Sequence, residues 1–163
     1  MKQMKKLNLT DFVSLALRLA ISAGYIWEVA DRLGFLGKHG SAHVGWGDWD
    51  HFMNYAGEVM SMLPHHLVPV LAVIATILEG LFGLLLLTGL FTRAAAMGSG
   101  LLSLSFALCM ALSFGIESPI GYSVFTLSAA SFLLALQPNC FWSLDGSSLF
   151  RHVLKRSGTA GVD

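Results

Sequence analysis

The chain has 163 residues, of which 55% are hydrophobic and 12% are charged, and its formal net charge is zero. Soluble domains carry about 25% charged residues, so this composition indicates one integral membrane domain over residues 1–163. Zero net charge gives no electrostatic basis for binding nucleic acid. Cys109 and Cys140 are too far apart in the sequence to form a dithiol redox motif.

Four apolar segments follow one another along the chain, at about residues 12–30, 67–90, 94–114 and 120–136. Each approaches the roughly 20 residues that a helix needs to cross the hydrocarbon core. Helices are the default spanning structure because lipid offers the backbone no hydrogen-bonding partner. We therefore expect an all-α fold, a bundle of four transmembrane helices. Arg18 interrupts the first segment and no clean cleavage site follows, so we expect a retained helix and no signal peptide.

The first segment carries polar residues at helical spacing. The stripe consists of Arg18, Ser22, Tyr25, Glu28 or Val29, and Arg32. Such a stripe should face the bundle or a wet cavity. Arg18 lies close enough to the membrane surface for snorkelling to be an alternative. Glu28 and Arg32 are four residues apart, a spacing that a surface ion pair explains.

The outer loop, about residues 32–64, is long for a connection in a compact domain. Its first part is rich in glycine, and residues 48–63 read as a short helix. Asp48 is a suitable N-cap and Pro64 ends the pattern. The apolar residues on one face are Trp49, Phe52, Met53, Ala56, Met60 and Leu63. We expect this amphipathic helix to lie in the interface or to cap the bundle.

Five of the six histidines lie in or beside the outer loop, and His152 lies in the tail. None falls in a spanning segment, so haem held between membrane helices is unsupported. The residues of a ligating type are His39, His43, Asp48 and His51, but they lack the spacing of a metal motif, and we predict no metal. Trp46 and Trp49 instead offer an aromatic surface for a lipid head group, a quinone ring or a protein partner.

Glu79 is the single charged residue between Leu67 and Thr92. A charge at the centre of the bilayer costs about 3 kcal/mol on insertion scales. Glu79 lies about 18 Å below the outer end of its helix, beyond easy reach of either interface. It is either protonated, or ionised and paired with Arg18 or a hydroxyl network. Its role is then a structural clamp or a proton-handling or ligand-binding group.

The basic residues predict the orientation of the chain. One side of the membrane receives Lys2, Lys5, Lys6, Arg93, Arg151, Lys155 and Arg156, and the other side receives Arg32 and Lys38. This asymmetry predicts that both termini are cytoplasmic in a multi-pass protein of the plasma (inner) membrane. Residues 137–163 would form a cytoplasmic tail.

The first helix contains Arg18-Leu19, Gly34 follows it, and the run from Glu79 to Ala95 reads EGLFGLLLLTGLFTRAA. In these residues, above all in that run, the chain resembles the DoxX family of small four-helix membrane proteins, which includes DoxD-type subunits. The resemblance covers about residues 15–136. The family typically has an arginine in its first helix and a Glu, Gly and Thr-Arg arrangement across its second and third helices.

The resemblance implies a redox-associated membrane protein, since DoxD-type relatives serve in thiosulfate:quinone oxidoreductase. The leading hypothesis is therefore a redox-complex subunit that contacts membrane quinone, holds no covalently bound cofactor and meets a protein partner through the outer loop. Glu79 and Arg18 would form its buried catalytic pair. The quinone-contacting residues would be Tyr25, Glu28, Trp46 and Trp49. The alternatives are a non-enzymatic assembly or scaffolding subunit and a small-molecule transporter, which four helices without a repeat disfavour. The oligomeric state is left open.

Overall fold

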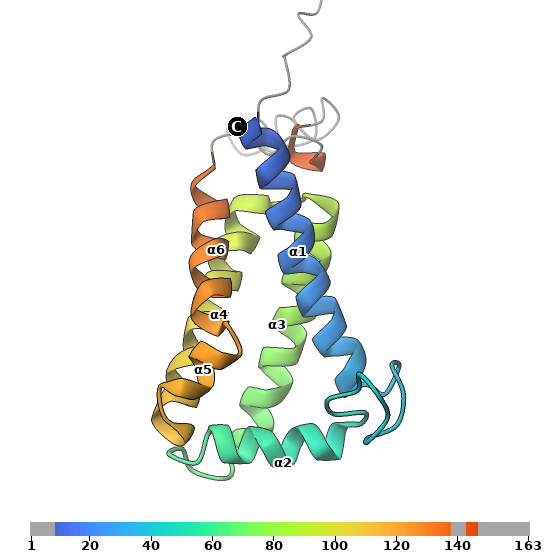
Figure 1. Cartoon of the computed structure of the whole chain (residues 1–163), viewed down its shortest axis with the longest axis vertical. Helices are drawn as coiled ribbons and strands as arrows, with labels where there is room; N and C mark the ends of the chain where they lie inside the picture. The colour runs from blue at the N-terminus through green and yellow to red at the C-terminus, as the bar shows by residue number, and fades with distance from the viewer. Residues whose placement is uncertain (1–8, 138–142, 147–163) are drawn as a thin grey trace, which may run out of the picture.

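The computed structural model describes residues 9–137 and 143–146, and the elements formed by these residues are all helical. They are α1 (Leu9–Arg32), α2 (Trp49–Val59), α3 (Val68–Thr88), α4 (Thr92–Phe114), α5 (Glu117–Gly121), α6 (Val124–Leu136) and the 3-10 turn η1 (Leu144–Gly146). Figure 1 shows α1, α3, α4 and α6 running along a common direction, with α2 lying across one end. The predicted all-α bundle with a loop helix is confirmed.

The four predicted spanning segments differ in whether they form long, continuous helices in the structure. In the described part of the chain, α1, α3 and α4 are long and apolar enough to cross a membrane, whereas α6 is a shorter apolar helix of 13 residues. The predicted segment 120–136 is divided into α5 and α6, because Ser123 adopts a left-handed conformation with φ 56°. At about 20 Å, α6 alone is shorter than the hydrocarbon core.

The ends of α3 and α4 are set by local backbone chemistry and by one distant residue. Pro69 stands in the first turn of α3, where its missing N–H leaves no hydrogen bond unmade. Gly89 ends α3 with φ 68°, a left-handed cap that glycine adopts without strain. The N-terminus of α4 is capped from far along the chain: the Asp145 carboxylate accepts the N–H groups of Phe91 and Thr92 at 2.7 and 2.8 Å.

Small residues bring the long helices together. α1 packs mainly on α3 and α4 mainly on α6. Gly98 receives the ring of Phe82, and Gly100 receives the ring of Phe132, because a Cβ on either glycine would lie within 2.7 Å of the ring. Close approach at small residues is the usual basis of helix association in membranes.

The helix α2 closes one end of the bundle, which we call the α2 end (Figure 1). Asp48 caps it as predicted, accepting the N–H of His51 at 2.9 Å. Its apolar face meets the start of α3, where Phe52 and Ala56 cluster with Val68 and Ala72. The start of α1, the end of α6 and η1 lie at the opposite end of the bundle. Which end faces the cytoplasm stays a prediction.

Candidate functional site

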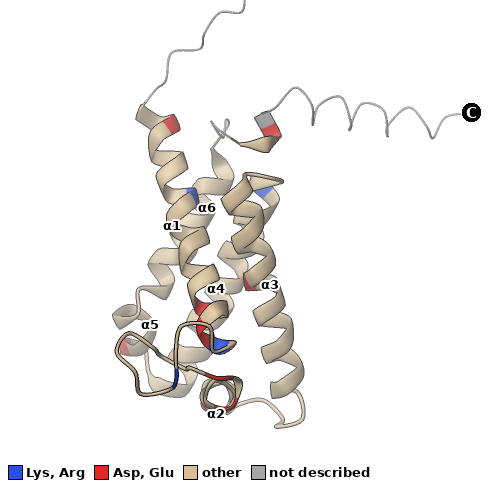
Figure 2. Ribbon diagram, turned by 90° about the vertical axis from the view of Figure 1, so that its right-hand side faces the viewer, with Lys and Arg blue, Asp and Glu red and all other residues tan. Residues whose placement is uncertain are grey.

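Glu79 lies in the middle of α3, about 16 Å from its first residue. Figure 2 shows few charged residues along the helices of the bundle. The Glu79 side chain is 3% exposed and is held by Arg32, the last residue of α1. Arg32 Nη1 donates to Glu79 Oε2, and Arg32 Nη2 donates to Glu79 Oε1 at 3.2 Å. The two side chains therefore form a buried, bidentate ion pair.

This pairing corrects the expectation that Arg18 is the partner of Glu79. Arg18 lies about 21 Å from Arg32 along α1. It is buried at the α3–α4 turn, where a Cβ on Gly89 would lie 2.6 Å from its Nη1. α1 and α3 are antiparallel, and the last residue of α1 meets α3 at Thr76 and Glu79, well past the start of α3. The register of the two helices thus brings Arg32 to Glu79.

The Arg32 guanidinium contacts groups from three helices. Nη1 donates to Thr76 Oγ1 of α3 at 3.2 Å, and the guanidinium carbon lies 4.2 Å from the ring centroid of Phe52 in α2. Glu28 Oε2 lies 3.9 Å from Nη2. The expected surface pair of Glu28 and Arg32 is therefore only the outer edge of a buried arrangement, because the Arg32 side chain is 7% exposed and that of Glu28 is 49% exposed.

Asp31, which the sequence did not single out, fixes the outer loop beside this pair. Its buried carboxylate accepts the backbone N–H groups of Gly45, Trp46 and Gly47 at 2.8, 2.9 and 3.2 Å. Consecutive N–H groups that converge in this way form a binding site for an anion. The loop so held places the Trp46 indole N–H 3.4 Å from Glu28 Oε2.

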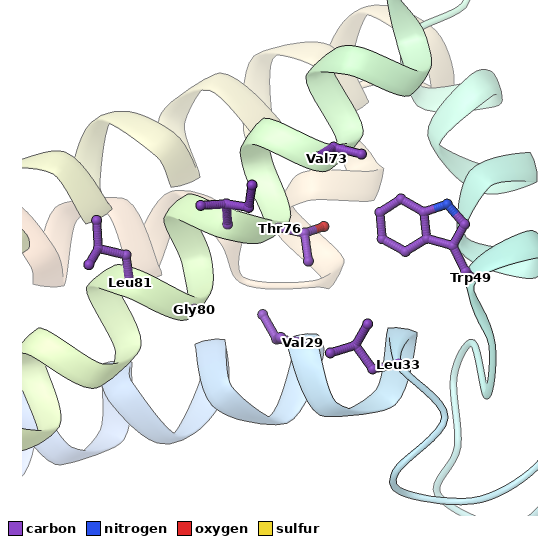
Figure 3. Close-up of a pocket in the computed structure, with 8 residues that line it drawn as sticks. Val29, Leu33, Trp49, Val73, Thr76, Gly80 and Leu81 are labelled. Atoms are coloured by element: carbon purple, nitrogen blue, oxygen red, sulfur yellow. The ribbon is translucent and has the colours of Figure 1, made fainter.

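A groove of about 390 Å³ lies between α1 and α3 close to the ion pair (Figure 3). It is lined by Val29, Leu33, Trp49, Val73, Thr76, Ile77, Gly80 and Leu81. The groove lies on the surface that would face lipid, since Ile77 is 63% exposed and Leu81 is 47% exposed. Thr76 belongs to both features, because it lines the groove and accepts a hydrogen bond from Arg32.

The structure separates the four residues expected to contact quinone. Trp49 lines the groove. Glu28, one turn before Arg32 in α1, and Trp46 contact each other. Tyr25 instead belongs to a buried hydroxyl network with α4, in which its hydroxyl lies 2.7 Å from Ser103 Oγ and 2.9 Å from the Ser99 carbonyl oxygen.

Three of the four weak metal-ligand candidates, His39, Asp48 and His51, are engaged with one another or with the backbone. The rings of His39 and His51 stack with centroids 3.7 Å apart. His39 Nδ1 lies 3.0 Å from the Trp46 carbonyl oxygen, and His51 Nδ1 lies 2.8 Å from Asp48 Oδ1. His43 is exposed, with φ 65°.

No group of three or more His, Cys, Asp or Glu residues in the described part of the chain could hold a metal ion. Cys140, His152 and the basic residues of both termini lie outside the described residues.

The helical bundle, with its apolar spans and a buried ion pair, defines a polytopic membrane protein. The model of the DoxX family matches residues 13–112, and the chain therefore belongs to the DoxX family. The matched range runs from α1 into α4 and includes Arg32, Glu79 and the residues of the groove. No curated protein and no solved structure matches the chain.

Proposed function

We propose that this protein is a redox-associated membrane subunit that contacts quinone in the groove between α1 and α3. One observation carries the proposal: the groove opens toward the bilayer, and Thr76 on its wall is hydrogen-bonded to the buried Arg32–Glu79 pair. An apolar molecule could therefore enter from the lipid and reach Thr76, which is bonded to the ion pair, without crossing water. This combination supports a function in quinone chemistry.

The size and lining of the groove are compatible with the head group of a quinone. Small-molecule sites usually enclose about 300–1,000 Å³ and combine apolar walls with a few polar groups. The groove has a volume of about 390 Å³, hydrocarbon walls, the aromatic face of Trp49 and the hydroxyl of Thr76. Gly80 widens the groove, because it lacks the Cβ that would contact a methyl group of Val29 at 4.0 Å.

Reduction of a quinone to a quinol consumes two electrons and two protons. In the proposal Glu79 takes up and releases these protons beside the groove, while Arg32 holds the carboxylate in place and Thr76, bonded to Arg32, connects the pair to the groove. Glu28 supports this role, since it is half-exposed and lies 3.9 Å from the same guanidinium, where it can exchange protons with water. The electrons would come from a soluble donor or partner at the α2 end.

The proton-handling role is tested by Glu79→Gln in membranes that carry the full chain. Thiosulfate serves as the electron donor and a short-chain benzoquinone as the acceptor, and quinone absorbance reports turnover. We expect turnover to fall about 100-fold, as is usual when a proton-transfer group is removed. Asp11→Asn, in the first turn of α1 at the opposite end of the bundle, is the control and should leave turnover unchanged. Normal turnover in Glu79→Gln, with the bundle assembled, would contradict the role.

A second candidate function is a non-enzymatic assembly subunit, and the contacts of Arg32 favour it. Arg32 joins α1 to Glu79 and Thr76 of α3 and to Phe52 of α2, as a structural clamp would. This function predicts that Glu79→Gln lowers stability or the recovery of partner chains. It also predicts that the purified protein carries no quinone.

A further inference from the structure

The hydrogen-bonding capacity of Thr76 determines which ligand the groove can accept. A hydroxyl group has one hydrogen to donate and two lone pairs to accept. Thr76 donates its hydrogen to the Ala72 carbonyl oxygen at 2.9 Å. One lone pair accepts a hydrogen bond from Arg32 Nη1 at 3.2 Å. One lone pair remains, so Thr76 offers the groove an acceptor and no donor.

Apart from Thr76, the side chains that line the groove present apolar surface to it. Val29, Leu33, Val73, Ile77 and Leu81 are hydrocarbon, and Gly80 has no side chain. Trp49 has an indole N–H, but Figure 3 shows its six-membered ring toward Thr76 and its nitrogen on the far side. A ligand ring in this groove therefore meets apolar surface and a single acceptor.

A quinone and its quinol differ in their ability to donate a hydrogen bond, and this is the property for which the groove selects. Quinone carbonyl oxygens only accept hydrogen bonds, whereas the hydroxyl groups of a quinol can donate them. A carbonyl buried against the free lone pair of Thr76 would stay unpaired, and an unpaired buried polar group is costly. We therefore propose that the groove binds quinol in preference to quinone, an inference that rests on the quinone-contacting function proposed above. Preferential binding of the reduced form makes the bound quinone a stronger oxidant.

The preference is measured with the full chain in lipid nanodiscs. Three ligands share a ring and a short tail: a benzoquinol, its benzoquinone, and its dimethyl ether, which keeps the ring and loses both donors. Binding is followed by tryptophan fluorescence, with Trp49→Phe identifying the signal from the groove. We expect the quinol to bind at least about tenfold more tightly than the other two ligands. A tenfold preference corresponds to a rise of about 30 mV in the potential of the bound couple.

Two substitutions of Thr76 assign the preference to its hydroxyl. Thr76→Ser keeps the acceptor and should keep the preference. Thr76→Val keeps the shape, removes the acceptor, and should bring the ratio of quinol to quinone affinity to about one. If Thr76→Val fails to assemble, the comparison of quinol with its dimethyl ether on the unaltered protein still decides the question.

The outcomes separate this inference from the proposed function. Equal binding of quinol and quinone would overturn the preference while the quinone-contacting function stands. An unchanged ratio in Thr76→Val would overturn the assignment of the preference to Thr76. Tighter binding of the dimethyl ether would also overturn the preference. Failure of both redox forms to bind would overturn the preference and the proposed function together.

Discussion

Arg32 is a buried cation whose charge is compensated on several sides. Removing an ion pair from water costs several kcal/mol for each ion, and good geometry is needed to repay this cost. The bidentate contact with Glu79 supplies that geometry, and charge-assisted hydrogen bonds of this type are among the strongest in proteins. The ring of Phe52 beneath the guanidinium adds a cation–π contact. Each of the two charged side chains is therefore stable in the interior only while the other is present.

Stability should reveal this dependence. Arg32→Met leaves the Glu79 carboxylate buried without its cation, and breaking a buried pair in this way costs about 3–5 kcal/mol. We expect the double variant Arg32→Met/Glu79→Leu, which removes both charges, to recover most of the loss. Unfolding of the purified protein in mild detergent measures the differences. If Arg32→Met alone is as stable as the unaltered chain, the pair does not hold α1 to α3.

Sequence reasoning identified Glu79 because a carboxylate in an uncharged span is conspicuous. It missed Arg32 as the partner because the first helix was expected to end near residue 30, which left Arg32 in the loop. The signal was nevertheless present. Arg32 continues the stripe of Ser22 and Tyr25, and all three side chains are buried. The choice between Arg18 and Arg32 depends on the register of α1 against α3, which no local pattern encodes.

The N-cap of α2 is Asp48, whose carboxyl group can be protonated as the pH falls. The N–H of His51, followed by its side chain, holds the pKa of Asp48 below its ordinary value of 3.8. A carboxyl group with a lowered folded-state pKa contributes stability above its unfolded pKa and loses it as the pH falls through the folded one. The cap should therefore stay intact at mildly acidic pH and fail only below pH 3.8.

Hydrogen exchange at the start of α2 checks this prediction. The protection of the His51 amide should be constant from about pH 7 to 5 and fall only below pH 3.8. Asp48→Asn keeps a capping oxygen and cannot titrate, so it should abolish the acid dependence. Loss of protection already near pH 6 would mean that a group other than Asp48 controls the start of the helix.

The elements themselves were largely predictable, and their interruptions were not. Apolar runs of nearly 20 residues predicted α1, α3 and α4, and an N-cap with a one-sided apolar pattern predicted α2. The break between α5 and α6 was missed because Ser123 takes a left-handed conformation that its residue type does not indicate. The cap on α4 was missed for a similar reason. It comes from Asp145, more than 50 residues away, and depends on tertiary structure.

At the scale of the whole molecule, α2 and the outer loop close one end of the bundle, and the start of α1 and η1 lie at the other (Figure 1). The distribution of basic residues predicts that the α2 end faces away from the cytoplasm. In a background with both cysteines replaced by serine, Lys38→Cys should react with an impermeant maleimide added to intact cells. Arg93→Cys should react only after lysis. The reverse labelling pattern would show that the α2 end faces the cytoplasm.

The central claim is that the groove beside Arg32 and Glu79 holds quinone, and mass spectrometry of the purified protein tests it most directly. The protein is extracted in mild detergent, and its quinone content is compared with that of two glycine variants. Gly80→Val fills the groove, whereas Gly24→Val adds the same side chain on α1 where nothing lies within 4 Å of the new Cβ. We predict that quinone accompanies the unaltered protein and Gly24→Val and is lost from Gly80→Val. Equal quinone in all three, or none in any, would contradict the claim.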